Sequence, residues 1–487
     1  MRVLHVSSEV APFAQSGGLA DVVAGLPGAQ AELGIDAAVL VPCYRGVPAR
    51  LADAGFPLDE GIPLPITLGM HHFDCLLRSA QVGRVRYGFL DCPPLYDREG
   101  NLYGPGGAAE FPDNHVRFAA LGKAALAAGE LLLRGRPDVL HVHDWQGGPA
   151  AIYAHLAGAP PAIVATIHNL AYRGIFGKDV MTELGIPWTM FTQELLEFYD
   201  QVSFLKGGLA LADVVTTVSP SYAQEILTPE RGEALDGFLR WNVKRVVGIV
   251  NGIDTMAWDP ARDETLPAPF TRATPRGLDG KAACRTALAA EAGLPELRDD
   301  EPLIGVIARM TDQKGLDLVA DIAPELGRCG ARLVVLGAGE PALEDRFRWL
   351  AGAFPREVAA RIGFDIGYAR RIYAGSDFFV MPSRFEPCGL GQLYAMRYGA
   401  VPIVTAVGGL RDTVQDPGDA ELAQGRGTGL KLDSVTASAL LAAIERGVRL
   451  FRDRAAFTTL RRAAMLRDSS WLASANEYVL LYRSLRA

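Results

Sequence analysis

The sequence predicts an α/β protein with two domains, each built on a doubly wound parallel β-sheet. Short apolar runs alternate with helical segments along the whole chain, which is the pattern of strand–helix–strand units. A chain of 487 residues is too long for one hydrophobic core, so two domains of similar size are expected. A glycine pair follows an early strand and recurs after a late one, which indicates that the two halves are related.

The strands are expected at the short apolar runs. In the first half these are residues 3–6, 38–41, 85–90, 139–142, 163–167 and 214–218. In the second half they are residues 303–308, 332–336, 378–381 and 401–404. The domain boundary is expected at Val247, ahead of a segment rich in Pro, Arg and Asp that continues to about residue 280. The domains are therefore residues 1–246 and 247–469, followed by a helical segment, 470–487, that ends at about Arg486.

Composition excludes several classes of protein. The net charge of −8 disfavours binding to nucleic acid or to an anionic membrane surface. The six cysteines include no Cys-x-x-Cys pair, which argues against a zinc site or a disulfide framework and for a reducing compartment. Residues 1–6 form a strand pattern rather than a signal peptide, and no apolar stretch reaches membrane-spanning length. We therefore expect a cytoplasmic protein without nucleic-acid or membrane partners.

The stretch from Ser383 to Leu390 is the centre of the functional hypothesis. It lies between the apolar run 378–381 and a helical segment, 392–396, that Gly399 ends. Strand, loop and helix in this order place residues 388–390 at a helix N-terminus, where backbone N–H groups bind anions or hydroxyl oxygens. Glu386 would add a hydrogen-bond acceptor that suits a polyhydroxylated ligand. A loop glutamate beside a buried cysteine is the structural alternative.

A second cluster follows the strand at 303–308. Arg309 comes at the carboxyl end of this strand, and Lys314 comes where the next helix begins. The crevice outside the carboxyl ends of the strands is where doubly wound sheets bind ligands. Two cations there suit a diphosphate, because arginine offers a planar fork and lysine a compact charge. A solvated surface pair is the alternative.

Three further patterns bear on ligand binding. The glycine pairs at 16–23 and 407–414 let backbone approach a ligand closely, although either pair alone is explained by a tight turn. His141 and His143 have the spacing of metal ligands, but alternate residues of a strand share one face, and a core role is favoured for at least one. No Asp-x-Asp occurs, so no metal site is predicted, and Arg309 with Lys314 would replace the charge of a metal.

Taken together, these motifs resemble those of the bacterial glycogen synthases and plant starch synthases, and the resemblance spans nearly the whole chain. The matching stretches are residues 6–9, 16–22, 141–145, 166–172, 250–254, 309–316 and 382–390. The resemblance implies the GT-B fold, with two Rossmann-like domains and an interdomain cleft. It implies transfer of glucose from ADP-glucose to the non-reducing end of an α-1,4-glucan such as glycogen, with retention of configuration and without a metal or other cofactor.

The resemblance also assigns roles. The nucleotide sugar is expected on the C-terminal domain, and the acceptor side of the reaction on the N-terminal domain, to which the C-terminal helix returns. The donor residues implied are Arg309 and Lys314 for the diphosphate, Tyr368 for stacking, and Glu386 with the amides of Cys388, Gly389 and Leu390 for the glucose. His168 and Asp144 match residues that crowd the reacting sugar, and Gln15, Gly17, Gly18 and Asn251 belong to the matching substrate-binding motifs.

Three positions distinguish this chain. Tyr394 stands where many retaining relatives carry a second glutamate, which favours a glucan synthase over a mannosyl- or sucrose-type transferase. Gln15 replaces the lysine that begins the family's Lys-x-Gly-Gly-Leu motif. A hydrogen bond to a charged group contributes about 1.5–3 kcal/mol, so we expect weaker catalysis or compensation by a nearby cation. Gly391 stands where relatives carry a hydroxyl or amide side chain, so one donor contact is expected to be absent.

The expected mechanism is same-face substitution, because no carboxylate has a sequence context that demands a nucleophilic role on the far face of the sugar. Residues 247–254 are the expected hinge, and Trp145, Tyr96 and Tyr103 are candidates to grip the glucan. Two alternatives stay open. One is a GT-B transferase that uses UDP-glucose or forms maltooligosaccharides, and the other is a weakly active or non-catalytic glucan-binding relative, motivated by Gln15. The sequence does not specify an oligomeric state.

Overall fold

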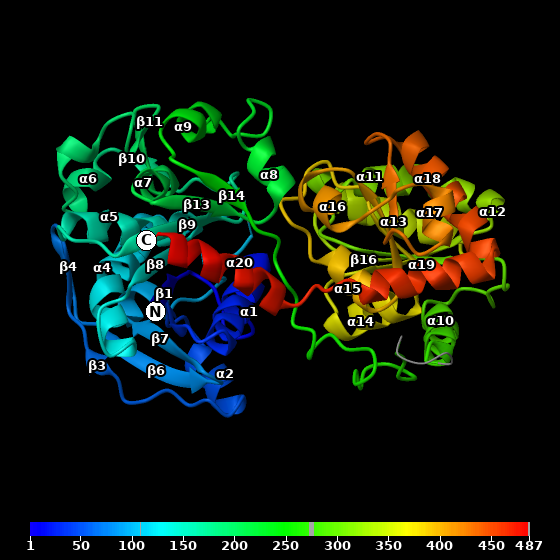
Figure 1. Ribbon diagram of the computed structural model, residues 1–487, viewed down its shortest axis with the longest axis horizontal. Helices are drawn as coiled ribbons and strands as arrows, with labels where there is room; N and C mark the ends of the chain where they lie inside the picture. The colour runs from blue at the N-terminus through cyan, green and yellow to red at the C-terminus, as the bar shows by residue number, and fades with distance from the viewer. Residues whose placement is uncertain (108, 272–276, 486–487) are drawn as a thin grey trace. The chain divides into compact units, whose positions relative to one another are not determined.

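A computed structural model describes residues 1–107, 109–271 and 277–485, so the end of the predicted C-terminal helix at Arg486 lies outside the described residues (Figure 1). The chain forms two compact units, residues 1–252 with 470–487 and residues 253–469. Each unit has its own sheet with helices packed around it (Figure 1). In the described ranges, no helix combines the length and apolar character needed to cross a membrane.

The first unit is built on a nine-stranded sheet in the order β14-β13-β9-β8-β1-β2-β7-β6-β3. The strands from β14 to β7 are parallel, and β6 and β3 continue the sheet in antiparallel pairing. All five residues of β8 are buried, as expected for a central parallel strand covered on both faces. The strands of this unit are β1 (Arg2–Val6), β2 (Asp36–Pro42), β3 (Ile62–Pro63), β4 (Ile66–Leu68), β5 (His71–Phe73), β6 (Leu76–Val82), β7 (Val85–Asp91), β8 (Val139–His143), β9 (Ala162–Ile167), β10 (Ile175–Gly177), β11 (Glu197–Phe198), β12 (Gln201–Ser203), β13 (Val214–Thr217) and β14 (Val246–Gly248).

The C-terminal helix packs in the first unit, against the helix that follows β1. A side chain at Gly25 would overlap the indole of Trp471, so the glycine allows the two helices to approach closely. Tyr478 and Tyr482 join the hydrophobic core formed by β1 and its neighbours. The helices of this unit are α1 (Gly18–Glu32), α2 (Val47–Asp53), α3 (Pro93–Tyr96), α4 (Asn114–Leu132), α5 (Asp144–Leu156), α6 (Val180–Glu183), α7 (Phe204–Ala210), α8 (Pro220–Glu225), α9 (Asp236–Trp241) and α20 (Trp471–Ser484), with a 3-10 turn, η1 (Trp188–Met190).

The second unit has a six-stranded sheet, parallel throughout, in the order β17-β16-β15-β18-β19-β20. Its longest helix begins where the Thr436 side chain accepts a hydrogen bond from the Ala439 N–H, and it buries Leu440, Ile444 and Val448 at a spacing of one helical turn. Its elements are β15 (Leu303–Ile307), β16 (Arg332–Gly337), β17 (Val358–Ile362), β18 (Phe378–Met381), β19 (Val401–Thr405), β20 (Leu430–Leu432), α10 (Asp279–Glu291), α11 (Leu316–Ile322), α12 (Leu326–Cys329), α13 (Pro341–Ala353), α14 (Ile366–Gly375), α15 (Gly391–Arg397), α16 (Gly408–Thr413), α17 (Asp419–Ala423), α18 (Ala437–Arg452), α19 (Arg454–Leu466), η2 (Asp312–Lys314) and η3 (Ala323–Glu325).

The predicted α/β fold with two parallel sheets is confirmed, and a strand forms at each predicted apolar run. Short or edge strands, among them β14, β17 and β20, form outside the predicted apolar runs. The expected boundary at Val247 falls inside β14, which pairs with β13 of the first sheet. That pairing extends the first unit beyond Val247 to Gly252.

Candidate active site

The candidate donor site lies in the second unit, where β15 and β18 are neighbours and parallel. Their carboxyl ends therefore lie at the same edge of the sheet, and the loops that follow them meet there. The loop after β15 carries Arg309 and Lys314, and the loop after β18 carries Ser383 and Glu386. Two sequence clusters that are far apart in the chain are brought together by this strand order.

The two loops are fixed to one another. Arg384 donates two hydrogen bonds to the Asp317 carboxylate, at 2.8 and 2.7 Å, and its backbone N–H donates to the Gln313 carbonyl. Gly315 has φ +65°, and a side chain there would overlap the Pro382 carbonyl, so only glycine allows this approach. These contacts hold the polar groups of both loops in place before any ligand arrives.

Lys314 and Glu386 form the polar centre of the site. The Lys314 ammonium donates to Glu386 Oε2 at 2.5 Å, and the Ser383 hydroxyl donates to the same oxygen at 3.2 Å. Both charged side chains are mostly buried. They line a cavity of about 190 Å³ together with Gly389, Leu390 and the apolar ends of β15 and β18. The cavity thus presents an ammonium, a carboxylate and a hydroxyl at one open pocket.

The loop from Cys388 to Leu390 passes directly into α15, with Leu390 as the N-cap, so its predicted place before a helix is confirmed. Among the described residues, the N–H groups of Gly389 and Leu390 have no hydrogen-bond acceptor. Gly389 has φ +74°, and the buried Gln392 amide donates to the Cys388 and Gly389 carbonyls. Gln392 therefore turns the carbonyls inward, which leaves those two N–H groups for a ligand.

Arg309 lies at the carboxyl end of β15, as the sequence hypothesis has it, whereas Tyr368 is buried. Arg309 is exposed at the end of β15 and does not line the cavity that holds Lys314. The Tyr368 side chain is only 2% exposed, and the Arg361 guanidinium covers its ring at 3.7 Å from the centroid. A ligand base therefore has no open face of Tyr368 to stack on.

Phe364, which is not among the predicted site residues, lies two residues after β17 and is 92% exposed. Because the six strands are parallel, Phe364 lies at the same edge of the sheet as the loops that follow β15 and β18. The sequence alone does not single out Phe364. Two aromatic residues, Phe364 and Tyr368, follow β17, and only the packing shows which one is buried. Phe364 is therefore the aromatic face available at this edge.

In the first unit, the predicted glycine turn is organised by Glu9. Its carboxylate accepts hydrogen bonds from the Ser16 N–H, at 2.7 Å, and from the Gly17 N–H, at 3.1 Å. A side chain at Gly17 would meet no atom within 4 Å, so this backbone is open to a ligand. The first helix, α1, begins at Gly18. Gln15 is exposed beside Asp21, whose pKa burial and the charge of Glu9 raise to about 6.

Asp144 and His168 are in contact, at the carboxyl ends of β8 and β9. The Asp144 carboxylate accepts a hydrogen bond from the His168 backbone N–H at 2.7 Å. Asp144 has φ +52°, a conformation that costs about 1–3 kcal/mol for a residue with a side chain. Burial raises the pKa of the Asp144 carboxyl to about 7, although backbone N–H donors partly offset it. Strain and a shifted pKa at one residue are typical of functional sites.

Asn251 is buried in the first unit, and its side-chain oxygen has no hydrogen-bond partner among the described residues. A buried polar atom without a partner is costly, so this oxygen is a candidate to accept a bond from a ligand. The three aromatic residues proposed to grip a glucan are packed instead. Trp145 and Tyr96 are buried, and the Tyr103 hydroxyl donates to Glu9 at 2.5 Å.

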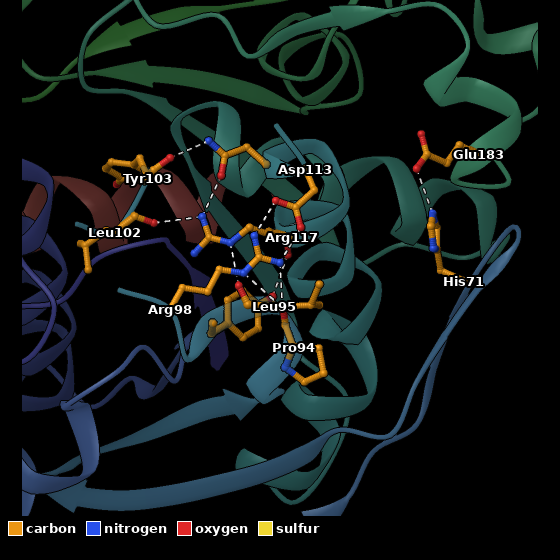
Figure 2. A network of polar contacts seen from close by, with 11 residues as sticks. His71, Pro94, Leu95, Arg98, Leu102, Tyr103, Asp113, Arg117 and Glu183 are labelled. Atoms are coloured by element: carbon orange, nitrogen blue, oxygen red, sulfur yellow. Dashed lines mark hydrogen bonds and ion pairs between the residues drawn. The ribbon is translucent and has the colours of Figure 1, made fainter. Parts of the chain in front are cut away.

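The neighbourhood of Tyr103 is a rigid polar network (Figure 2). The buried Arg117 guanidinium donates to the Leu95 carbonyl at 2.8 Å and to the Leu102 carbonyl at 3.1 Å. Arg98 donates two hydrogen bonds to Asp113, both at 2.6 Å. This network explains why the aromatic side chains here serve packing rather than a glucan-binding surface.

The arrangement in the second unit suits one chemical class of ligand. An ammonium and free backbone N–H groups bind an anion, and a carboxylate with a hydroxyl binds sugar hydroxyl groups. A sugar joined to a phosphate presents both features. The exposed aromatic ring of Phe364, on the same edge, would suit a planar base.

Comparisons with known proteins agree with this chemistry. The family described as starch synthase catalytic domain matches residues 2–241, and the family described as glycosyl transferases group 1 matches residues 301–448. The chain is 48% identical to a glycogen synthase of Anaeromyxobacter dehalogenans and 44% identical to one of Myxococcus xanthus. Both matches cover 100% of this chain and 100% of the relative.

Solved structures give the same result. The catalytic domain of starch synthase IV from Arabidopsis thaliana, bound to ADP and acarbose, matches with a TM-score of 0.87 and 30% identity. The match covers 100% of this chain and 99% of that one. Sucrose-phosphate synthase from Thermosynechococcus elongatus matches with a TM-score of 0.58 at 20% identity, over 100% of this chain and 99% of that one, which shows a shared fold.

Proposed function

The chain belongs to the glycogen synthase family, and from this premise we propose that it transfers glucose from ADP-glucose to the non-reducing end of glycogen. Elongation of an α-1,4-glucan is the activity of the family. The observation that supports this donor class most directly is the Lys314–Glu386 pair beside the open N–H groups of Gly389 and Leu390. We propose that the enzyme works in the cytoplasm, because its six scattered cysteines suit a reducing compartment.

ADP-glucose is proposed over UDP-glucose because a starch synthase with 30% identity to this chain was solved with ADP. Lys314 and the exposed Arg309 would bind the diphosphate, and Glu386 would accept hydrogen bonds from glucose hydroxyl groups. Phe364, rather than the buried Tyr368, would offer the ring on which the base stacks. This assignment corrects the sequence-based choice of Tyr368, because Arg361 already covers that ring.

The acceptor side of the reaction is assigned to the first unit. Asp144 and His168 are in contact there, and Asn251 offers an unpaired side-chain oxygen. The open backbone at Gly17, next to Gly18 at the start of α1, would let a substrate approach closely, with Gln15 in the place of the family's lysine. These groups are neutral or only weakly charged at neutral pH, which suits an uncharged glucan.

We propose same-face substitution as the mechanism. Glu386 is held by the Lys314 ammonium and the Ser383 hydroxyl, an environment that suits a hydrogen-bond acceptor rather than a nucleophile. The bond from the anomeric carbon to the diphosphate breaks as the bond to the glucan hydroxyl oxygen forms. The leaving phosphate, stabilised by Lys314 and Arg309, takes the proton of that hydroxyl. No glucosylated side chain is expected in trapping experiments, and a stable adduct on Glu386 would contradict the scheme.

The proposed donor is tested by measuring nucleotide release from ADP-glucose and UDP-glucose, each with and without glycogen. We expect ADP release that depends on glycogen and exceeds UDP release, together with incorporation of glucose into the polymer. A preference for UDP-glucose would favour the alternative transferase. Absence of chain elongation with either donor would favour a glucan-binding relative without activity.

A further inference from the structure

A chain of hydrogen-bonded side chains lies inside the first unit and ends at His168. Gln30 Oε1 on α1 lies 2.8 Å from Nε2 of His5 on β1. His5 Nδ1 lies 3.1 Å from Nε2 of His143 on β8, and His143 Nδ1 lies 3.0 Å from His168 Nε2. Gln30, His5 and His143 are buried, and His168 is partly exposed.

The three rings are neutral at physiological pH. Burial lowers the pKa of His5 to about 4 and that of His168 to about 3, and it lowers the pKa of His143 well below its ordinary value. A neutral imidazole carries one N–H and one lone pair. Each ring in the chain must therefore donate one hydrogen bond and accept one.

Gln30 sets the direction of these bonds. Its amide nitrogen donates to the Tyr482 hydroxyl at 3.0 Å, so the amide oxygen faces His5 and can only accept. His5 must then carry its proton on Nε2, and its Nδ1 must accept from His143. His143 in turn accepts from His168, which places the proton of His168 on Nε2 and leaves a lone pair on Nδ1.

A second branch starts at the same amide. The Tyr482 hydroxyl accepts from Gln30 and lies 2.6 Å from Nδ1 of His141. His141 Nε2 lies 2.6 Å from the Thr166 hydroxyl. One buried amide thus orients both branches, and Tyr482 on the C-terminal helix holds that amide. Rotating the amide by half a turn would reverse every bond and place the proton of His168 on Nδ1.

A metal ion is the competing explanation, since ring nitrogens of His5, His141 and His143 lie within 4.8 Å of one another. Each of these nitrogens already has a hydrogen-bond partner in the protein. The hydrogen-bond chain therefore accounts for the cluster without an ion. His168 Nδ1, by contrast, has no hydrogen-bond partner among the described residues, so it is the end of the chain that a ligand can use.

We propose that Gln30 is a positioning residue that fixes His168 in the tautomer with a bare Nδ1, so that His168 accepts a hydrogen bond from a substrate hydroxyl. The inference rests on the proposed function, in which His168 acts on the reacting sugar. A bare nitrogen recognises a hydroxyl group and discriminates against a phosphate or carbonyl oxygen, which offers no proton. The hydrogen-bond chain thus suits the first unit to the sugar hydroxyls of its substrates.

The tautomer is measured on the full chain by nitrogen NMR with ¹⁵N-labelled histidine, because a protonated and a bare ring nitrogen differ widely in chemical shift. The His168 signals are those that vanish in His168→Gln. We expect a bare Nδ1 in the wild type and a mixture of tautomers in Gln30→Met. Tyr482→Phe should give a smaller change in the same direction. The control Thr166→Val breaks only the His141 branch and should leave the His168 signals unchanged.

Kinetics separates this inference from the proposed function. Loss of one oriented hydrogen bond predicts that Gln30→Met lowers kcat about tenfold, with little change in KM for the donor. A proton on Nδ1 of His168 in the wild type, which needs no variant to fold, would overturn the inference, and so would an unchanged spectrum in Gln30→Met. An altered tautomer with unchanged kcat would instead contradict the role of His168 in the reaction.

Discussion

Each unit has a buried polar network, and the two networks differ in kind. In the first unit the buried network consists of neutral imidazoles, hydroxyl groups and one amide, centred on His5, His141 and His143. In the second unit a buried carboxylate lies at the centre of a network of ions. Asp377 accepts hydrogen bonds from Arg285 at 2.9 Å and Arg461 at 2.6 Å, and no histidine occurs after His168 in the sequence.

The difference matches what each unit is proposed to bind. A network of neutral side chains can fix the direction of its hydrogen bonds, because the tautomer of one imidazole determines the tautomer of the next. Ions supply charge, and an anionic donor needs fixed cations whose own environment is already compensated. The unit with the Asp377 ion network carries Lys314 and Arg309, and the unit with the histidine network carries His168 and Asn251.

The largest effect is expected from Asp377→Asn, which leaves two half-buried arginines, Arg285 and Arg461, without a carboxylate partner. Burial raises the pKa of Asp377, but the charges of Arg461 and Arg285 hold it below its ordinary value. Removing one partner of a buried ion pair costs about 3–5 kcal/mol. Hydrogen exchange should show this loss of stability as faster exchange of the backbone amides of the second unit. Thr166→Val, which removes neutral hydrogen bonds in the first unit, should cost only about 1 kcal/mol per bond. Equal losses would contradict the comparison.

Lys314→Met should lower kcat/KM with ADP-glucose about 10²–10³-fold, because one fixed charge at the leaving diphosphate is lost. Arg309→Met should act in the same direction. Lys431→Met is the matched control, since Lys431 lies in the same unit and donates to the Arg411 carbonyl, away from the cavity. Steady-state nucleotide release measures all three variants. A similar loss of kcat/KM in the control would mean that the net charge of the unit, rather than the position of Lys314 in the cavity, determines activity.

The first unit should be the more acid-labile. Its buried histidines have lowered pKa values, so their neutral forms stabilise the fold above about pH 6.5, and this stability is lost as the pH falls toward about 4. Asp144 and Asp21 have raised pKa values and partly oppose this trend, because their contribution grows as the pH falls. Between about pH 6.5 and pH 4, we therefore expect the free energy of unfolding of the first unit to fall by roughly 1–3 kcal/mol per pH unit. Hydrogen exchange at pH 7 and pH 5 measures it, and earlier opening of the second unit would contradict it.

Phe364→Ala should raise KM for ADP-glucose about tenfold and change kcat little, because stacking of the base contributes about 0.5–1.5 kcal/mol beyond apolar contact. The matched control is Trp349→Ala, another exposed aromatic residue of the second unit, at 63% exposure. The control should leave KM unchanged. If Tyr368→Leu raised KM while Phe364→Ala did not, the original sequence-based choice of Tyr368 would be restored.

The smallest effect is expected from Gln15→Lys, which restores the cation of the family motif beside Asp21. A gain of about tenfold in kcat is expected, the lower end of the range for a charged hydrogen bond, because Gln15 is exposed. Gln81→Lys adds the same charge on β6 and serves as the control. No gain over the parent would show that the glutamine carries no penalty.

The fold was predictable because buried parallel strands appear in the sequence as continuous apolar runs. The polar loops were predictable because each comes directly after a strand. The Lys314–Glu386 pair was predictable as two clusters, although their contact depends on the neighbouring positions of β15 and β18. The histidine chain was not predictable, since Gln30 and Tyr482 are 452 positions apart and only the packing of α20 brings them together. Tyr368 was expected to stack because of the family resemblance, and the sequence does not show that it is buried while Phe364 is exposed.

The most direct test of the account is hydrogen exchange of the full chain with and without saturating ADP, compared with Lys314→Met. The account predicts protection in residues 306–316 and 380–391 of the wild type, and much weaker protection in the variant. Protection confined to the first unit, or equal protection in Lys314→Met, would contradict it.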